Sequence, residues 1–175
     1  TAALLSGSEE QFRSLVLVLA LQGAKSQWVN PKEKAIFQLI LDQANIPLDS
    51  QLSFSLSIDD PLGKSVDLIS YNEYFGWYYV TFFADQMMIA EGTLRKLMFE
   101  VMPNIKISSS FNKPIHISEF GAGAKFGNHT NKIWSEQYQA KLYEHQLEML
   151  SNNPQIQGIS PWVFKDFRAM LRPLP

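Results

Sequence analysis

The stretch PIHISEFGAG at residues 114–123 decides the fold class. Its apolar residues predict a buried strand, and the small residues that follow predict a turn with open space above the strand's carboxyl end. The strand ends on a carboxylate, Glu119, at the place where βα-barrels keep their catalytic groups. Glu119 is therefore the first candidate catalytic residue. The alternative is a strand-end glutamate in a solvated loop.

Two further apolar runs repeat this pattern, VDLISY at residues 66–71 and IQGISPWVF at residues 156–164. Ile69, Ile117 and Ile159 mark comparable points and are 48 and 42 residues apart. Each interval accommodates one strand, one helix and two loops, as in βα units. The sequence predicts three parallel strands.

Amphipathic stretches fill both intervals. The first predicts a helix that is capped at Thr93 and ended by Pro103, and the second predicts a longer helix that begins near Asn131 or Ser135 and stops before Pro154. The expected fold class is therefore α/β, built from parallel βα units.

The first 60 residues have a different pattern. Asn30, Pro31 and Glu33 form a capping-box-like helix start, and Ser8 is the expected cap of an earlier helix, although β-branched residues leave a strand possible there. Residues 46–60 are interpreted as a connection. The apolar positions of the two helices, which would suit the covering of an open sheet, are Phe12, Leu15, Val16, Leu19, Ile36, Leu39 and Ile40.

Composition excludes several classes. Fifteen Lys and Arg stand against 17 Asp and Glu, a net charge of −2, which argues against a nucleic-acid or membrane partner held by a basic patch. Cysteine is absent, which excludes a thiol nucleophile and thiolate zinc sites. The run LVLVLAL at residues 15–21 is shorter than the roughly 20 residues of a membrane span. Because the chain opens on Thr1 and ends at Pro175, we expect a processed chain or a fragment.

Two aromatic segments follow the ends of predicted strands. YNEYFGWYY at residues 71–79 offers the flat apolar rings, amide and phenols that a sugar site uses, and a packed aromatic corner is the alternative. SPWVFKDFR at residues 160–168 places Trp162 where it could form the floor of a pocket, or serve as a large core residue.

Four motifs resemble, in order and spacing, the C-terminal half of the catalytic (β/α)₈ barrel of glycoside hydrolase family 2, closest to the β-glucuronidases. They are NEYFGWY at 72–78, PIHISEFG at 114–121, WSEQYQ at 134–139 and WVFKDF at 162–167. The resemblance covers about residues 64–172.

The resemblance implies a division of the chain. Residues 64–175 correspond to βα units of a TIM barrel, about strands 5 to 8, and residues 1–63 form a divergent helical and connecting region that covers the partial barrel. Within the latter, residues 1–5 are similar to the end of the barrel's fifth strand, and residues 6–58 match the family poorly.

The resemblance also implies an activity, that of a retaining β-glycosidase that hydrolyses terminal β-glycosides through a glycosyl-enzyme. Glu119 matches the nucleophile, and Asn72 and Tyr74 match residues that contact sugar and nucleophile. Tyr78 and Trp162 match further substrate-binding residues. No cofactor and no metal is implied, and the expected partner is a carbohydrate.

The family's general acid/base, a Glu after Asn on the fourth strand, would precede Thr1. The dipeptide Asn72-Glu73 imitates it but matches the sixth strand, and the Asn-x-Lys element that reads a glucuronide carboxylate would follow Pro175. The alternative function is therefore a non-catalytic half-barrel that binds carbohydrate weakly or self-assembles. Either way, an open half-barrel is expected to pair with a second copy, to pair with its missing half, or to cover its edge with residues 6–58.

Other chemistries find little support. The loop at residues 121–127 lacks dinucleotide and P-loop spacing, no Gly-x-Ser-x-Gly elbow occurs, and the three histidines show no paired metal-ligand spacing. His116 is predicted to point away from the barrel axis because it alternates with Ile117 and Glu119. His129 is a candidate pocket-lining residue.

Overall fold

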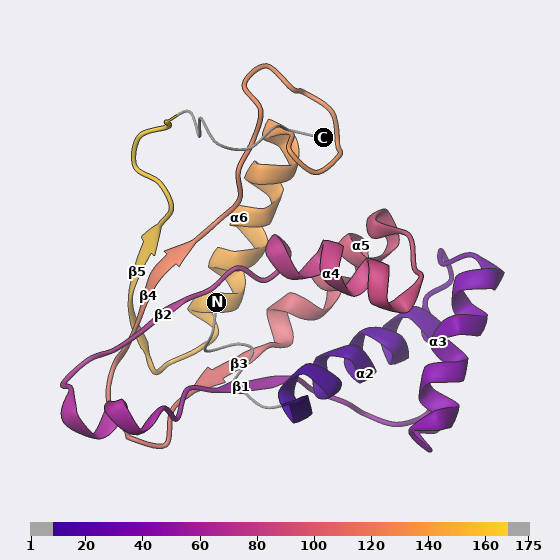
Figure 1. Ribbon diagram of the computed structural model, residues 1–175, viewed down its shortest axis with the longest axis horizontal. Coiled ribbons are helices and arrows are strands. Elements are labelled where there is room, and N and C mark those ends of the chain that lie inside the picture. Colours follow the sequence, from indigo (N-terminus) through magenta and orange to yellow (C-terminus); the bar gives the residue numbers. More distant parts are fainter. Residues whose placement is uncertain (1–8, 168–175) are drawn as a thin grey trace.

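The computed structural model describes residues 9–167. Its centre is a parallel sheet in the order β2 (Ile69–Asn72), β4 (Ile115–Phe120) and β5 (Ile156–Pro161) (Figure 1). These are the three strands that the sequence predicts, and the α/β class is confirmed. Within the described residues the strands do not close into a barrel. The predicted strand at residues 1–5 lies outside the described part of the chain.

The first central strand begins later than predicted. A short 3-10 helix, η1 (Pro61–Ser65), precedes it, and the Asp60 side chain caps this helix by accepting a hydrogen bond from Leu62 N at 2.9 Å. Val66 and Leu68 are exposed rather than paired in the sheet. The apolar run at residues 66–71 therefore predicts a strand that begins three residues too early.

A second parallel pair, β1 (Ser55–Ser57) and β3 (Lys106–Ser108), was not predicted, since residues 46–60 were expected to be a connection. Side chains from the segment before β5 pair with the backbone around β3. Asn153 accepts from Ile107 N at 2.7 Å and donates to Ile105 O at 3.1 Å, and Gln155 makes the same two kinds of bond with Ser109. Amide side chains thus join the two sheets.

The predicted helices are present. The longer one is α6 (Glu136–Ser151), with Ser135 as its N-cap, whose Oγ accepts from Tyr138 N at 3.1 Å. The other is α5 (Glu91–Val101), followed by the 3-10 turn η2 (Met102–Asn104). Thr93 was predicted to cap α5, but this prediction is wrong because the helix begins two residues earlier, at Glu91.

A helix that was not predicted, α4 (Tyr78–Met87), follows the aromatic segment. No side chain caps its start. Its buried residues Val80, Phe83, Ala84 and Met87 follow the i, i+3, i+4, i+7 spacing of one helix face, so the sequence did carry a signal for this helix. The last two residues of the aromatic segment, 78 and 79, thus form the start of this helix.

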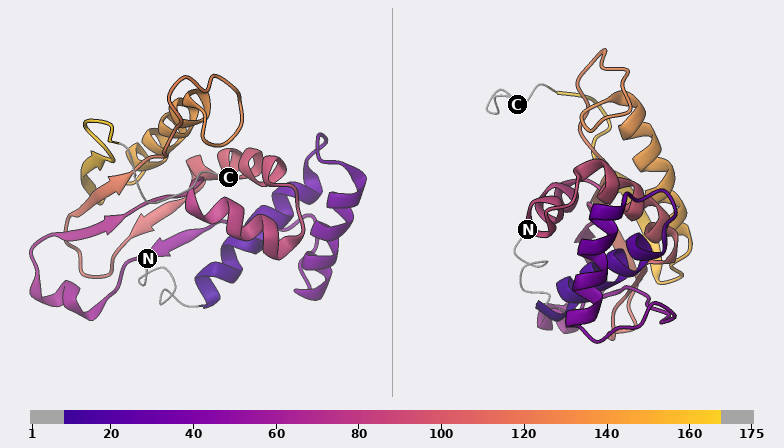
Figure 2. Two further views of the ribbon diagram at one scale, coloured as in Figure 1. Left: turned by 45° about the horizontal axis from the view of Figure 1, so that its top comes forward. Right: turned by 90° about the vertical axis from the view of Figure 1, so that its right-hand side faces the viewer.

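The N-terminal region forms two helices, α2 (Glu9–Lys25) and α3 (Pro31–Gln43). Asn30 caps α3 as predicted, with its Oδ1 accepting from Glu33 N at 3.0 Å, and the predicted strand alternative for the first helix is excluded. The pair packs together and against α5, at the opposite end of the molecule from β5 (Figures 1 and 2). Ser8, the predicted cap of α2, lies outside the described residues.

The core runs through the middle of the molecule and includes the buried face of β4. Ile115, Ile117 and Phe120 are almost fully buried, and the Phe120 ring meets Tyr143 of α6 with centroids 5.6 Å apart. None of the described helices is long and apolar enough to cross a membrane.

Candidate active site

A register shift in the sheet determines where Glu119 points. Ile117 of β4 pairs with Tyr71 of β2, but the next pair joins Asn72 to Glu119, so one extra residue lies on β4 between them. This bulge reverses the alternation, and Phe120 rather than Glu119 is buried with Ile117. Glu119 therefore lies on the open face of the sheet.

The same bulge overturns the prediction for His116. Ahead of the shift, His116 alternates with the buried Ile115 and Ile117, so it shares the open face with Glu119 instead of pointing away from it. Its Nε2 lies 3.0 Å from Ser160 Oγ of β5. The prediction was wrong because it assumed an unbroken period of two residues.

Tyr74 is the direct partner of Glu119. Its phenol donates a hydrogen bond to Glu119 Oε2 at 2.7 Å. Burial raises the pKa of Tyr74, and the hydrogen bond to Glu119 and the charge of Glu119 raise it further. The phenol therefore stays protonated at neutral pH and remains a donor to the carboxylate.

A tight turn after β2 brings Tyr74 to this position. Glu73 N donates to Glu119 O at 2.8 Å, which ties the start of the turn to the end of β4. Gly76 adopts a φ of +81°, and a Cβ there would lie 2.5 Å from Leu142 Cδ1. The turn thus requires glycine at this position for both conformation and space.

Tyr78 and Asn72 border the same end of the sheet. The rings of Tyr74 and Tyr78 meet edge to face with centroids 5.0 Å apart, and 54% of Tyr78 is exposed. Asn72 is exposed and accepts a hydrogen bond from Ser118 Oγ at 2.6 Å. Both side chains can therefore be reached from solvent.

Trp162 is fastened beside the end of β4 by its backbone. Its N–H donates to Phe120 O at 2.8 Å, and its carbonyl accepts from the Tyr143 phenol at 2.7 Å. The residue is 46% exposed and so is not a core residue. Because Phe120 follows Glu119 in the chain, this bond places the backbone of Trp162 beside the end of the strand that bears Glu119.

The aromatic segment divides between the two interpretations. Phe75 and Trp77 are buried, and Trp77 meets Trp134 edge to face with centroids 4.6 Å apart, as expected for a packed aromatic corner. Tyr74 and Tyr78 face the open end of the sheet, as expected for a ligand site. Trp134 has a φ of +66° and precedes α6 instead of lying on its face.

The structural role of Glu73 was not predicted from the sequence. It is fully buried, and its carboxylate accepts from Phe75 N rather than facing Glu119. Burial raises the pKa of Glu73 to about 8. Its position excludes it as the proton donor to a sugar on the open face.

The remaining candidates contribute little. His129 is exposed and lies 3.2 Å from Glu136 Oε2, on the loop before α6. Among the described residues, no group of three acidic or histidine side chains is arranged to hold a metal ion.

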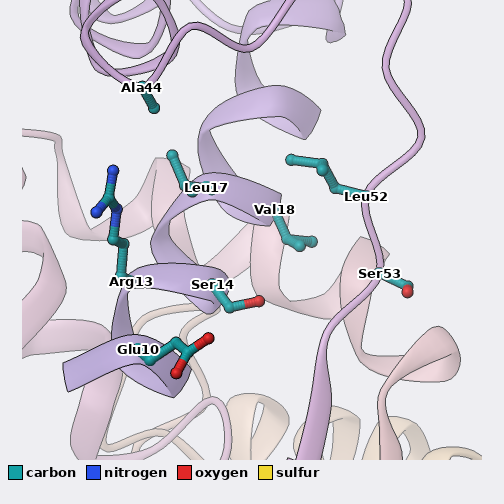
Figure 3. A pocket seen from close by; sticks show the side chains of 8 residues that line it. All are labelled: Glu10, Arg13, Ser14, Leu17, Val18, Ala44, Leu52 and Ser53. Atoms are coloured by element: carbon teal, nitrogen blue, oxygen red, sulfur yellow. The ribbon is translucent and has the colours of Figure 1, made fainter. Parts of the chain in front are cut away.

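A hollow of about 310 Å³ lies elsewhere, between α2, the end of α3 and the segment before β1 (Figure 3). Its lining residues are Glu10, Arg13, Ser14, Leu17, Val18, Ala44, Leu52 and Ser53. None of the predicted site residues lines it.

No family model and no curated protein matches the chain. Solved structures with a partial likeness include β-glucuronidases from Ruminococcus gnavus and Faecalibacterium prausnitzii. The first is 20% identical over 75% of this chain and 23% of that chain, with a TM-score of 0.43. The second is 23% identical over 78% and 23%, with a TM-score of 0.41. The chain thus spans less than a quarter of the length of these proteins.

Proposed function

We propose that this chain is part of the catalytic domain of a retaining β-glycosidase, similar to family 2 β-glucuronidases, with Glu119 as its nucleophile. The observation that carries the proposal is the 2.7 Å hydrogen bond from the Tyr74 phenol to Glu119 Oε2 at the carboxyl end of a parallel strand. A carboxylate placed and oriented in this way is what nucleophilic attack on a sugar requires.

In the proposed reaction, Glu119 Oε1 attacks the anomeric carbon while the bond from that carbon to the leaving oxygen breaks. Tyr74 donates its phenol to Oε2, which orients the carboxylate and leaves Oε1 to the sugar. A covalent glycosyl-enzyme results, and water then attacks the anomeric carbon and releases Glu119.

The leaving oxygen needs a proton from a second carboxyl group about 5–5.5 Å from the nucleophile. Glu73 cannot supply it, since its carboxylate is buried at Phe75 N. We propose instead that the acid/base is supplied by polypeptide outside these 175 residues, as the resemblance to family 2 barrels implies.

Three side chains are proposed to form the sugar subsite. Asn72 and Tyr78 offer an amide and a phenol to sugar hydroxyls, and Trp162 offers an exposed ring to a C–H face.

The second candidate function is a half-barrel that binds carbohydrate weakly or self-assembles. It is favoured by the apolar side chains at the β5 edge, where Ile159 is 41% exposed and Phe164 fully so. A second copy of the chain or the missing half would cover this edge.

The test is intact-protein mass after incubation with activated 2-deoxy-2-fluoro-β-glycosides, the glucuronide first. Their leaving groups depart without acid assistance, so the missing proton donor does not prevent labelling. We expect wild type to gain one sugar on Glu119, Glu119→Gln to gain none, and the exposed control Glu144→Gln to label as wild type. A folded wild-type chain that no sugar labels would favour the second function.

A further inference from the structure

The turn that carries Tyr74 is held from beneath by α6. Gln146 of this helix donates Nε2 to Phe75 O at 3.1 Å, and the Tyr138 phenol donates to Gly76 O. Phe75 N donates in turn to the carboxylate of Glu73. The three peptide groups that follow Tyr74 are therefore each fixed by a buried side chain.

Two of these side chains lie in the interior with incomplete hydrogen bonding. Glu73 and Gln146 are both fully buried. One oxygen of each, Glu73 Oε2 and Gln146 Oε1, has no hydrogen-bond partner. A neutral carboxylic acid would carry a donor into this place, whereas a carboxylate would add a charge to an already undersatisfied interior.

We propose that Glu73 and Gln146 are positioning residues, which hold the Phe75 peptide so that the Tyr74 phenol reaches Glu119, and that loss of the proton on Glu73 releases this arrangement. The catalytic consequence of the proposal rests on the proposed function, whereas the positioning itself concerns the Tyr74 contact alone. The chain order supports the positioning role. The Phe75 N–H donates to the Glu73 carboxyl group, and Tyr74 lies between these two residues in the chain.

Burial supports the protonation step, because it raises the pKa of Glu73 to about 8, against the lowering effect of its bonds to Phe75 N and Gln146. No charged group contributes to this shift.

The other titratable groups around the turn respond to different charges. Burial is the main cause of the pKa shifts of Tyr138 and His145. The charges that act on Tyr138 are those of Arg95 and Glu91 of α5, and the charges that act on His145 are those of Lys141, Glu148 and Glu144 of α6. On the side of the site, Tyr74 responds to Glu119, Tyr78 and Tyr143. The raised pKa of Glu73 therefore has burial as its main cause, and we expect the titration of these other groups to have little effect on it.

The experiment is NMR of the chain labelled with ¹³C at tyrosine Cζ, with Tyr74→Phe assigning the signal, titrated from about pH 5 to 9.5 around the raised pKa. We expect the Tyr74 signal of wild type to move with a midpoint near pH 8. Glu73→Gln should remove that step, and the exposed Glu144→Gln should keep it. Glu119→Gln should also keep it, which separates the step from any titration of Glu119.

A step that persists in Glu73→Gln, or that wild type lacks, overturns the proposal. If Glu73→Gln does not fold, Gln146→Met provides the second test, because it removes the donor to Phe75 O and keeps the side-chain volume. We expect it to displace the Tyr74 signal throughout the titration, and an unchanged signal overturns the role of Gln146.

These measurements need no substrate, so they are independent of the proposed function. With a labelling sugar in hand, the rate in wild type should fall about fiftyfold from pH 8 to 10, in step with the protonated fraction of Glu73, and should fall less in Glu73→Gln. If the Tyr74 signal titrates with Glu73 but no sugar labels Glu119, the proposed glycosidase function fails and the positioning role stands. If Glu119 is labelled but the Tyr74 signal does not titrate with Glu73, the positioning role fails and the proposed function stands.

Discussion

The Tyr74 phenol and the Glu119 carboxylate, 45 residues apart in the chain, are joined by a hydrogen bond of 2.7 Å across two parallel strand ends. Because a hydrogen bond to a charged group contributes about 1.5–3 kcal/mol, Tyr74→Phe should slow sugar labelling of Glu119 about 10- to 150-fold. The measurement is the labelling rate by intact mass. Unfolding by urea provides the control for folding, and an unchanged rate would separate the phenol from the nucleophile.

Glu33 connects two helices through its buried carboxylate. It accepts hydrogen bonds from Ala90 N at 2.9 Å and Thr93 Oγ1 at 2.8 Å, and so caps α5 from α3. Glu33→Ala should lower the free energy of unfolding by about 2–4 kcal/mol, since buried donors lose their acceptor. Urea unfolding would measure this, with the exposed Lys32→Ala from the same turn as control. Equal stability of the two variants would contradict the bridging role.

Sequence patterns predicted those parts of the fold whose signals are local. Ser135 and Asn30 each cap a helix by a hydrogen bond to the residue three positions later, so both helix starts could be predicted from adjacent sequence. The apolar run at 115–120 forms a strand with the predicted bounds. The cap of α5 could not be found in this way, because its acceptor, Glu33, lies 57 residues from Ala90. Nor could β1, which is three residues long and depends on its pairing with β3.

The site followed the same division. The motifs named Tyr74 and Glu119 as neighbours, and the structure joins them. The bulge that turns Glu119 and His116 to one face has no sequence signal of its own. Glu73 was considered as an acid/base because it follows Asn72, but in the structure it is fully buried and interacts with Gln146 of the distant helix α6.

The stability of the chain should depend on the ionisation of Glu73. Its folded-state pKa, about 8, lies above the ordinary value of 4.5, so the folded state binds the proton more tightly. This contribution is fully present below pH 4.5 and is lost as the pH rises to about 8, at a cost of a few kcal/mol. Urea unfolding from pH 5 to 8.5 should show the decline in wild type and a flatter profile in Glu73→Gln. Parallel profiles would refute the buried titration.

Asn153 is expected to matter more for stability than its amide suggests. It accepts from Ile107 N and donates to Ile105 O, and so pairs with the backbone of β3 and of the residue before it in addition to the strand neighbour β1. Asn153→Ala leaves both buried backbone groups unpaired and should cost about 2–4 kcal/mol, measured by urea unfolding. The exposed Asn152→Ala is the adjacent control. A loss below about 1 kcal/mol would mean that the backbone finds other partners.

Trp162 allows the proposed sugar subsite to be tested separately from folding, because the residue is half-exposed while its backbone is bonded to Phe120 and Tyr143. Trp162→Ala keeps both backbone bonds and removes the ring, so stability should change by less than about 1 kcal/mol. Loss of an aromatic face against a sugar should raise the reagent concentration that gives half-maximal labelling rate by about tenfold. The fully exposed Phe164→Ala, two residues on, is the matched control. If Trp162→Ala saturates at the wild-type concentration, the ring does not face the sugar. If it unfolds instead, the ring stabilises the fold and the subsite must be built from Asn72 and Tyr78.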